Sequence, residues 1–211
     1  IYRDNPGLVI AVAGSYGKTS MKELLVAGLS ADKKVASTPG NRNTLLSQAQ
    51  FASKLSGDED FVIVELGEGA PGDVAKMVDL IDPDYAVVTG LAPNHLDQYK
   101  NIESIAKDFG ALVDKVGVDR TYLNADSPEL FRLLGTKGTN YSSDGFDGWV
   151  PIDVSVGVDS LKFEVEKCGK SFKLVSMFVG RHNIGPILFA IIFAERLGLK
   201  RRNIIKNIEV L

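Results

Sequence analysis

The chain has 211 residues, of which 45% are hydrophobic and 24% are charged, and its formal net charge is −3. A chain of this length removes roughly 70% of its unfolded surface from water on folding, so it can build a large core. The small negative charge argues against a nucleic-acid partner, because phosphate contacts require an excess of Lys and Arg. No apolar run reaches the roughly 18–20 residues of a membrane span. The single cysteine, Cys168, excludes an intrachain disulfide and favours a cytoplasmic location.

The two ends of the sequence favour a segment of a longer polypeptide. The chain begins with Ile1 rather than Met, and an apolar run that starts at Leu8 already has the character of a buried strand. The other end stops on the apolar Leu211 within a helical pattern. A whole protein trimmed by processing or by tag removal is the alternative. From the length we expect one domain, residues 1–211, that carries an elaboration.

Short apolar runs alternate with helical patterns through the first 135 residues. The predicted strands are Leu8–Ala13, Lys34–Ser37, Phe61–Leu66, Tyr85–Thr89 and Thr121–Asn124, and the predicted helices are Lys18–Ser30, Thr44–Leu55, Gly72–Leu80, Ile102–Val116 and Pro128–Leu134. The strand segments are continuously apolar or β-branched, as expected for a parallel sheet covered on both faces. The alternation predicts an α/β fold with a doubly wound, mostly parallel sheet and right-handed crossovers.

The pattern changes after Gly135. Residues 135–148 are rich in Gly, Ser, Thr and Asp and show no helical period. The next three segments alternate apolar with polar residues; they are Val150–Val158, Leu161–Val165 and Ser171–Val175. They predict a small antiparallel meander, inserted at about residues 149–178, with one face exposed. A helix over about Ile187–Leu197 and a shorter helix then complete the chain.

A glycine-rich loop lies directly after the first predicted strand and directly before a helix. Its sequence is Gly14-Ser15-Tyr16-Gly17-Lys18-Thr19-Ser20. Such a loop can turn backbone N–H groups toward a phosphate, and the helix dipole adds positive potential. Lys18 would reach the terminal phosphates, and the Thr19 hydroxyl would ligate Mg²⁺. The full pattern also has a glycine five residues before Gly17, where this chain has Val12, so the match is to a shortened form. It favours a P-loop NTPase-like fold, and a turn that only caps a helix is the alternative.

Two further residues follow strands that should end beside this loop. Glu65 stands at the end of the predicted strand at residues 61–66, and His95 follows the predicted strand at residues 85–89. Doubly wound sheets bind ligands at the carboxyl ends of their strands. A carboxylate there can hold Mg²⁺, which prefers oxygen ligands, and His95 could ligate a metal or contact phosphate. A solvated strand-end charge and an exposed loop histidine are the alternatives.

Five motifs, in this order, resemble those of the Mur ligase family. They are residues 14–24, Thr38-Pro39-Gly40-Asn41-Arg42-Asn43-Thr44, Val64-Glu65-Leu66-Gly67 with Pro71-Gly72-Asp73-Val74, Asn94-His95-Leu96-Asp97, and Gly180-Arg181-His182-Asn183-Ile184. The resemblance runs from about residue 8 to residue 211. It corresponds to the central ATPase domain of a three-domain family, so the domains that flank it there would lie outside this chain.

The resemblance implies an ATP-dependent peptide ligase of cell-wall precursor synthesis that works through an acyl phosphate, with ATP and Mg²⁺ as cofactors. By position it assigns Lys18 and His95 to catalysis, residues 14–20 and Asn183 to nucleotide binding, Thr19, Glu65 and His95 to metal, and Asn41 and Asn43 to the substrate. His182 would shape the nucleotide pocket or begin a helix. The UDP-muramyl peptide, and the amino acid or dipeptide joined to it, would be bound largely by the flanking domains.

Two positions depart from the family pattern. Many relatives have a carbamylated lysine, which acts as a metal ligand, where this chain has Phe109. Lys107 lies two residues earlier, about 200° away around a helix. A family asparagine is replaced by Pro186, which would alter one side of the adenine pocket. These departures favour one alternative, a nucleotide-binding scaffold that has lost catalysis. A folate polyglutamate ligase-like enzyme is a second, and a generic P-loop kinase would leave His95 without a purpose.

Overall fold

The computed structural model describes residue 2 and residues 7–211. The chain forms two compact units, one of Ile1–Lys22 with Lys33–Asn140, and one of Glu23–Asp32 with Tyr141–Leu211. Helix α1 (Lys18–Leu29) begins in the first unit and continues into the second. Among the residues described, no helix combines the length and the apolar character needed to cross a bilayer.

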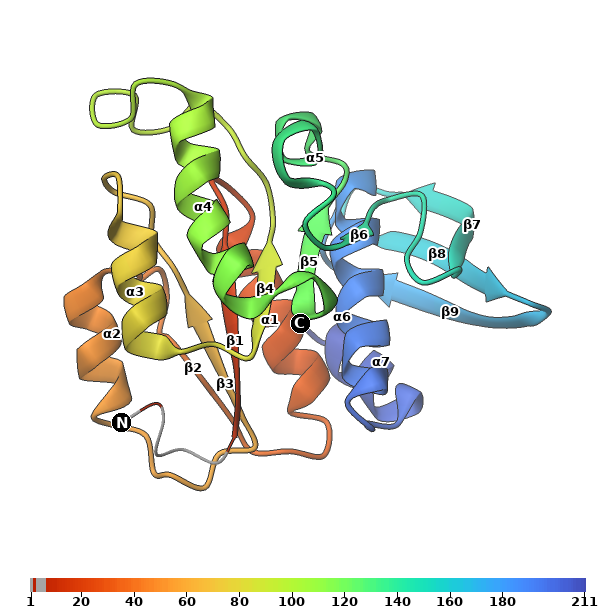
Figure 1. Cartoon of the computed structure of the whole chain (residues 1–211). Helices are drawn as coiled ribbons and strands as arrows, with labels where there is room; N and C mark the ends of the chain where they lie inside the picture. The colour runs from red at the N-terminus through yellow and green to blue at the C-terminus, as the bar shows by residue number, and fades with distance from the viewer. Residues whose placement is uncertain (1, 3–6) are drawn as a thin grey trace. The chain divides into compact units, whose positions relative to one another are not determined.

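The first unit is built on a six-stranded sheet in the order β2-β3-β1-β4-β5-β6 (Figure 1). Its strands are β1 (Leu8–Ala13), β2 (Val35–Ser37), β3 (Phe61–Glu65), β4 (Tyr85–Val88), β5 (Thr121–Asn124) and β6 (Thr139–Tyr141). β1 pairs in parallel with both β3 and β4, and the pairs β2–β3 and β4–β5 are parallel as well. The predicted doubly wound, mostly parallel sheet is confirmed, and β6 is an additional short strand in the segment that showed no helical period.

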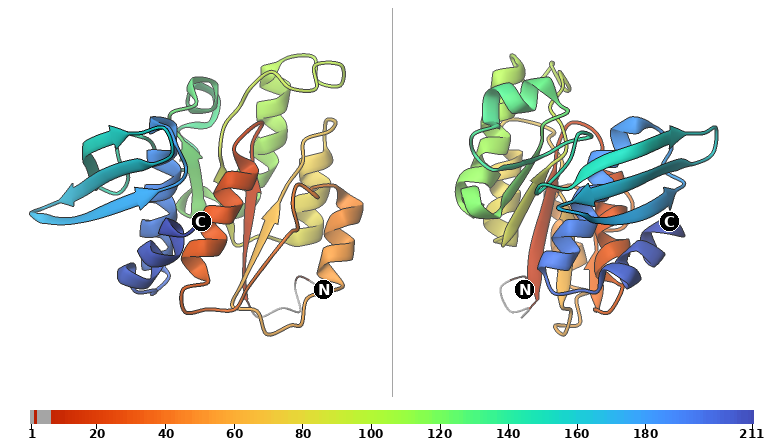
Figure 2. Two further views of the ribbon diagram at one scale, coloured as in Figure 1. Left: turned by 180° about the vertical axis from the view of Figure 1, so that it is seen from behind. Right: turned by 90° about the vertical axis from the view of Figure 1, so that its right-hand side faces the viewer.

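The helices of this unit, besides the start of α1, are α2 (Leu45–Ala52), α3 (Asp73–Ile81), α4 (Ile102–Val116) and α5 (Pro128–Leu134), with a short 3₁₀ turn at Val118–Arg120. Alternate residues of β1 point to opposite faces of the sheet. Val9, Ala11 and Ala13 belong to a core that includes Val74 of α3 and Leu112 of α4. α3 and α4 cover the face seen in Figure 1, and the first turn of α1 lies on the opposite face, as the reverse view in Figure 2 shows.

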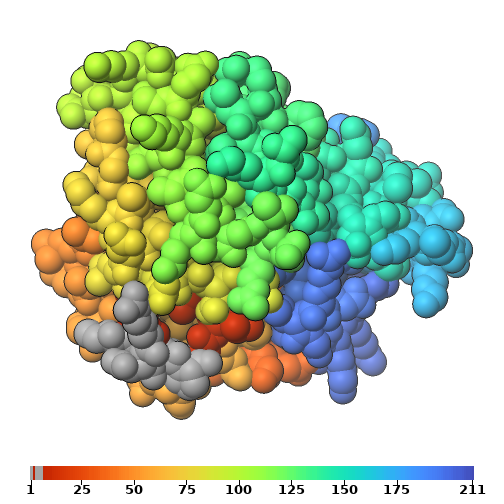
Figure 3. All heavy atoms as spheres, viewed as in Figure 1, coloured from red at the N-terminus to blue at the C-terminus, as the bar shows by residue number. Residues whose placement is uncertain are grey.

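A buried carboxylate on α4 caps the start of α3. The residue before α3, Gly72, is left-handed (φ 87°) and offers no side chain for capping. Asp108 of α4 accepts the Gly72 N–H at 2.9 Å and the Tyr99 hydroxyl at 2.7 Å. Burial raises the pKa of Tyr99, and the hydrogen bond to Asp108 raises it further. Helices α3 and α4 lie side by side, as Figure 3 also shows. The hydrogen bond from Gly72 to Asp108 fixes the segment between β3 and α3.

The second unit contains a three-stranded antiparallel sheet and two helices. Its elements are β7 (Val150–Val156), β8 (Leu161–Lys167), β9 (Lys170–Ser176), a 3₁₀ turn at Arg181–Asn183, α6 (Ile184–Arg196) and α7 (Arg201–Glu209). The sheet order is β7-β8-β9, with a register shift between Ile152 and Ser155. This confirms the predicted meander. α6 begins three residues earlier than predicted, because Pro186 falls in its first turn, where a missing N–H costs no hydrogen bond.

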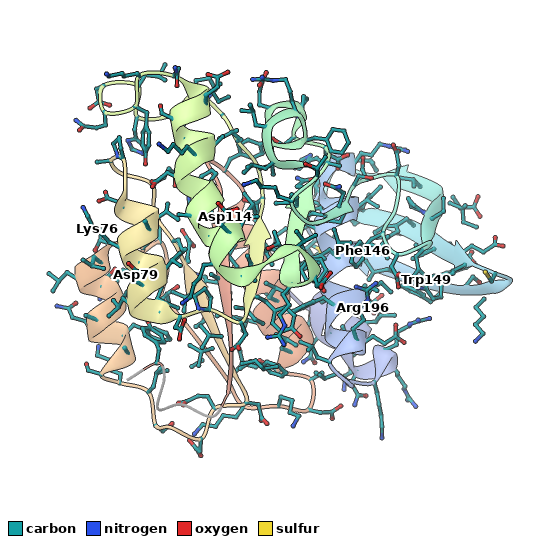
Figure 4. The ribbon with its side chains drawn as sticks, viewed as in Figure 1. Lys76, Asp79, Asp114, Phe146, Trp149 and Arg196 are labelled. Atoms are coloured by element: carbon teal, nitrogen blue, oxygen red, sulfur yellow. The ribbon has the colours of Figure 1, made fainter. Side chains whose placement is uncertain are left out.

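Aromatic rings organise the core of the second unit around α6. Phe189 stacks on Tyr141 at 4.8 Å and on Phe193 at 5.3 Å between ring centroids. The Arg196 guanidinium lies 5.2 Å from the centroid of Phe146, a contact of the cation–π kind, and Figure 4 shows both side chains. The continuous burial of residues 187–194 explains why this helix has no polar face.

We expect Asp108→Ala to lower the free energy of unfolding by about 2 kcal/mol, since the Gly72 N–H and the Tyr99 hydroxyl both lose their acceptor. Asp114→Ala on the same helix is the matched control. Asp114, labelled in Figure 4, is exposed. It pairs at the surface with Lys137, so its loss should cost less than about 1 kcal/mol. Urea denaturation followed by circular dichroism measures both, and equal losses would contradict the capping role.

Candidate active site

The glycine-rich loop is held in place by the segment that follows β4. Gly14 has φ 143°, and a Cβ at this position would lie 2.3 Å from the Thr89 hydroxyl oxygen, so a glycine is required. The Ser15 N–H donates to the Gly90 carbonyl at 2.9 Å. The Asn94 amide in turn donates to the Ser15 carbonyl at 2.8 Å. The loop conformation is therefore set by residues that are distant in sequence; Asn94, for example, lies 79 positions after Ser15.

α1 begins at Lys18, directly after this loop, and carries no acidic residue in its first turn. Its first N–H groups lack intrahelical acceptors, and the helix dipole makes this end positive. The Lys18 ammonium donates to the Gly14 carbonyl and to Glu68, whose carboxylate lies 3.0 Å away. Both side chains are largely buried, at 13% exposure for Lys18 and 3% for Glu68. The loop thus combines free helix N–H groups with a lysine that has a carboxylate partner.

Glu65, the last residue of β3, is the centre of a buried polar network. The side chain is only 1% exposed. The Thr19 hydroxyl donates to its Oε2 at 3.0 Å, and the Asn43 amide donates to its Oε1 at 3.2 Å. The Lys22 ammonium lies 3.6 Å from Oε2. An alcohol and a cation from α1 and an amide from the loop after β2 therefore converge on one carboxylate of β3.

Lys22 is completely buried and ties the loop after β2 to this network. Its ammonium donates to the carbonyls of Thr38, at 2.9 Å, and Gly40. The Thr38 hydroxyl accepts the backbone N–H of Glu65 at 3.0 Å. Lys22 lies one helical turn after Lys18, so the two ammonium groups extend from one side of α1. Each holds a different carboxylate, Glu68 or Glu65.

A cavity of about 310 Å³ opens beside this network. Its lining includes Ser15, Lys18, Asn43, Glu68, Asp73 and His95. The loop that carries Asn43 approaches β3 closely, since a Cβ at Gly67 would lie 2.7 Å from the Asn43 carbonyl oxygen. His95 has a left-handed backbone (φ 52°), and its carbonyl accepts the N–H groups of Gln98 and Tyr99, both at 2.8 Å. This turn places the histidine in the cavity wall.

The structure brings most of the residues singled out from the sequence into this region. Ser15, Lys18, Asn43 and His95 line the cavity, and Thr19 and Glu65 join it through the hydrogen bond of Asn43. Asn41, which was expected to face the substrate, is exposed and is not part of the lining. Tyr16, Gly17 and Ser20 are exposed in the loop and the first turn of α1.

The structure also shows the surroundings of Asn183, Phe109 and Lys107. Asn183 belongs to the second unit, where its amide donates to the Val179 carbonyl at 2.8 Å and the neighbouring His182 is exposed. Phe109 is fully buried in the core of the first unit, so it offers no ligand to a metal. Lys107 of α4 lines a different cavity, of about 590 Å³, which Pro71 and, from α3, Ala75 also line.

The donor set around Glu65 fits Mg²⁺. This cation prefers oxygen ligands, keeps several waters, and is commonly held by one or two protein groups together with phosphate oxygens. The Glu65 carboxylate and the Thr19 hydroxyl are such oxygens, 3.0 Å apart at the start of the candidate phosphate-binding helix. In the described part of the chain no group of three or more His, Cys, Asp or Glu side chains forms a metal-binding cluster.

Sequence reasoning missed two charged residues of the site, Glu68 and Lys22. Glu68 follows Glu65 by three positions, and Lys22 follows Lys18 by four. The helical spacing of the two lysines was a usable signal, because residues four apart lie on one side of a helix. Nothing in the local sequence around Glu68 indicates that its carboxylate is buried.

The model of one protein family, the Mur ligase middle domain, matches residues 12–194. The chain belongs to the Mur ligase family. The UDP-N-acetylmuramoyl-tripeptide–D-alanyl-D-alanine ligase of Escherichia coli K12 is 27% identical over 199 residues, which cover 92% of this chain and 44% of that protein. This chain thus spans less than half the length of that Mur ligase.

Solved structures of Mur ligases share the fold. MurF from Acinetobacter baumannii superposes with a TM-score of 0.85 at 22% identity, over 99% of this chain and 47% of that one. MurF from Thermotoga maritima, crystallised in complex with ADP, superposes with a TM-score of 0.77 at 22% identity, over 99% of this chain and 49% of that one. The likeness covers both units of the Mur ligase middle domain described here.

We expect Lys22→Met to destabilise the protein by about 3–5 kcal/mol, since it leaves the buried Glu65 carboxylate without its cation. Lys33→Met is the matched control, because Lys33 pairs with Asp60 at the surface and should contribute less than about 1 kcal/mol. Adding Glu65→Gln to Lys22→Met should recover part of the loss by removing the uncompensated charge. Urea denaturation measures the three variants. A loss for Lys22→Met no larger than that of the control would refute this role.

Proposed function

We propose that this chain is the ATP-binding part of an ATP-dependent ligase that joins an amino acid or a dipeptide to a UDP-muramyl peptide. The observation that carries the proposal is the network in which Thr19, beside the loop lysine Lys18, donates to the buried Glu65 at 3.0 Å. The E. coli relative is named as a ligase of a UDP-muramyl tripeptide and D-alanyl-D-alanine, and the T. maritima relative was crystallised with ADP. The first name supports the substrate class, and the bound ADP of the second supports nucleotide binding.

The residues of the loop would bind the phosphates of ATP. The N–H groups at the start of α1 and the Lys18 ammonium supply donors to phosphate oxygens. The Thr19 hydroxyl and the Glu65 carboxylate would hold Mg²⁺, which when bound neutralises phosphate charge and orients the phosphate for transfer. Lys22 pairs with Glu65 from the buried side and holds its side chain in place. Asn183 remains our candidate for an adenine contact.

The reaction class follows from the substrates. The carboxylate of the muramyl peptide would attack the γ-phosphorus of ATP, ADP would leave, and an acyl phosphate would form. The amine of the incoming amino acid or dipeptide would then attack the acyl carbon and release phosphate, with loss of a proton from nitrogen. Negative charge builds on the phosphoryl oxygens in the first step, where Lys18 would stabilise it. His95 and Asn43 line the cavity and would contact the reacting groups.

A scaffold that binds nucleotide without catalysis is the second candidate. The observation that favours it is Phe109, which is fully buried where many relatives have a metal-binding carbamylated lysine. The two proposals differ in what happens to bound ATP. A ligase domain should release phosphate, if only slowly, whereas a scaffold should bind ATP and leave it intact.

We expect Lys18→Ala to weaken the binding of ATP in the presence of Mg²⁺ by about tenfold or more, because a charge-assisted phosphate contact is lost. Lys33→Ala, which removes an exposed lysine outside the cavity, is the control and should bind ATP like the parent. Titration calorimetry measures the affinities. Equal affinity for the parent and Lys18→Ala would refute the nucleotide site.

We also expect the parent chain to release phosphate from ATP slowly, at well under the roughly 1 s⁻¹ of an ordinary enzyme. The reason is that fast transfer of the phosphate requires an acceptor carboxylate held beside ATP in a site closed to water. The assay contains ATP and Mg²⁺ without that acceptor. Phosphate release in the presence of Mg²⁺ is followed by a coupled colorimetric assay, with Lys18→Ala as the negative control. ATP that is bound but stays intact in both proteins would favour the scaffold.

A further inference from the structure

Glu68 is a buried carboxylate within the candidate phosphate cavity that no motif of the sequence explains. It lies between β3 and α3, is 4% exposed, and lines the cavity together with Lys18 and His95. Its Oε2 lies 3.0 Å from the Lys18 ammonium. Carboxylates are seldom buried to this degree unless they are paired. The partner of Glu68 is Lys18, the lysine that we propose binds phosphate.

A negative charge at this position opposes the binding of a phosphate. Glu68 compensates Lys18, so much of the positive potential that the lysine would offer to an anion is already used. Phosphates entering the cavity would also meet the carboxylate directly, and like charges in a partly buried site repel strongly. A site built only to attract phosphate would have a neutral or cationic residue here.

The other acidic residue of the cavity is engaged differently. Asp73 accepts the Ala70 N–H at 2.9 Å and pairs with the exposed Lys76 at 3.3 Å. These contacts of Asp73 lie at the first turn of α3 and do not involve Lys18. Among the residues that line the cavity, Glu68 is thus the carboxylate with an observed contact to the loop lysine.

We propose that Glu68 makes nucleotide binding at this loop dependent on a divalent cation. This inference rests on the proposed function and adds a residue that determines its specificity. Without a divalent cation the carboxylate occupies Lys18 and repels the phosphates. When a cation accompanies the nucleotide, the carboxylate faces that positive charge instead, and Lys18 becomes available to a phosphate oxygen. Metal-free nucleotides and other bare anions are therefore rejected, while the nucleotide bound to its cation is accepted.

The experiment measures the affinity of ADP for the 211-residue chain by titration calorimetry, once with excess EDTA and once with excess Mg²⁺. Glu68→Gln removes the charge and keeps the shape of the side chain. Asp79→Asn removes one negative charge from the exposed surface of α3, outside the cavity, and is the matched control (Figure 4). Thermal denaturation of each variant verifies that it is folded, and Glu68→Asp serves as a second variant that keeps the charge.

For Glu68→Gln in EDTA we expect ADP to bind about fivefold or more tightly than to the parent, since one repulsive charge is gone and Lys18 is released. The gain in affinity on adding Mg²⁺ should be correspondingly smaller than the gain of the parent. Asp79→Asn and Glu68→Asp should respond to Mg²⁺ like the parent.

Three results would overturn the inference. Glu68→Gln could bind ADP like the parent under both conditions, or more weakly in EDTA, and either would show that Glu68 does not oppose the phosphates. An equal gain for Asp79→Asn would show a general charge effect. If the parent binds ADP in the presence of Mg²⁺ and the variants give one of these results, the inference alone fails and the proposed function stands. If the folded parent binds no ADP even with Mg²⁺, the proposed function fails and the inference with it.

Discussion

The buried carboxylate of Glu65 is the interaction on which the candidate site depends. It joins three segments that the chain brings together only through the parallel sheet: α1 through Thr19 and Lys22, the loop after β2 through Asn43, and β3 itself. A buried charge of this kind is costly unless every partner is present, so it selects one arrangement of these loops. Since β3 pairs with both β1 and β2, the sheet order places the three segments at one edge before any side chain makes contact.

Much of the fold could be predicted from the sequence, because the signals that specify it are local. The five predicted strands of the first unit are mostly apolar or β-branched runs, and each was found within one residue of its expected ends. β6 was missed because Thr139–Tyr141 is short and polar and becomes a strand only by pairing at the sheet edge. The register shift in β7 likewise depends on its partner strand and leaves no mark in the alternation of residues.

Residues of the candidate site could be predicted where their position in the sequence indicates their role. They could not be predicted where the role depends on burial in the folded chain. Lys18, Thr19, Glu65 and His95 could be named because each directly follows a strand or a glycine-rich turn. Glu68 and Asp108 could not, since a glutamate in a loop and an aspartate in a helix are exposed by default. Lys22 was missed although its spacing from Lys18 placed both on one side of a helix. Their roles arise from tertiary contacts: a carbonyl pair for Lys22, the loop lysine for Glu68, and the start of α3 for Asp108. Asn41 is the opposite case, a motif residue that the loop leaves exposed.

The charges of the site follow one logic. Two lysines one helical turn apart, Lys18 and Lys22, meet two carboxylates, Glu68 and Glu65, so the network is formally neutral. Lys22 and Glu65 are both shielded from solvent, whereas Lys18 and Glu68 line a cavity that a ligand could enter. A bare nucleotide would bring several negative charges to a site that has no cation to spare. A divalent cation that accompanies the nucleotide would restore the balance, and Glu65 and Thr19 would supply oxygen ligands to it. On the proposal made above, the neutral network would favour the nucleotide with its cation over phosphate alone.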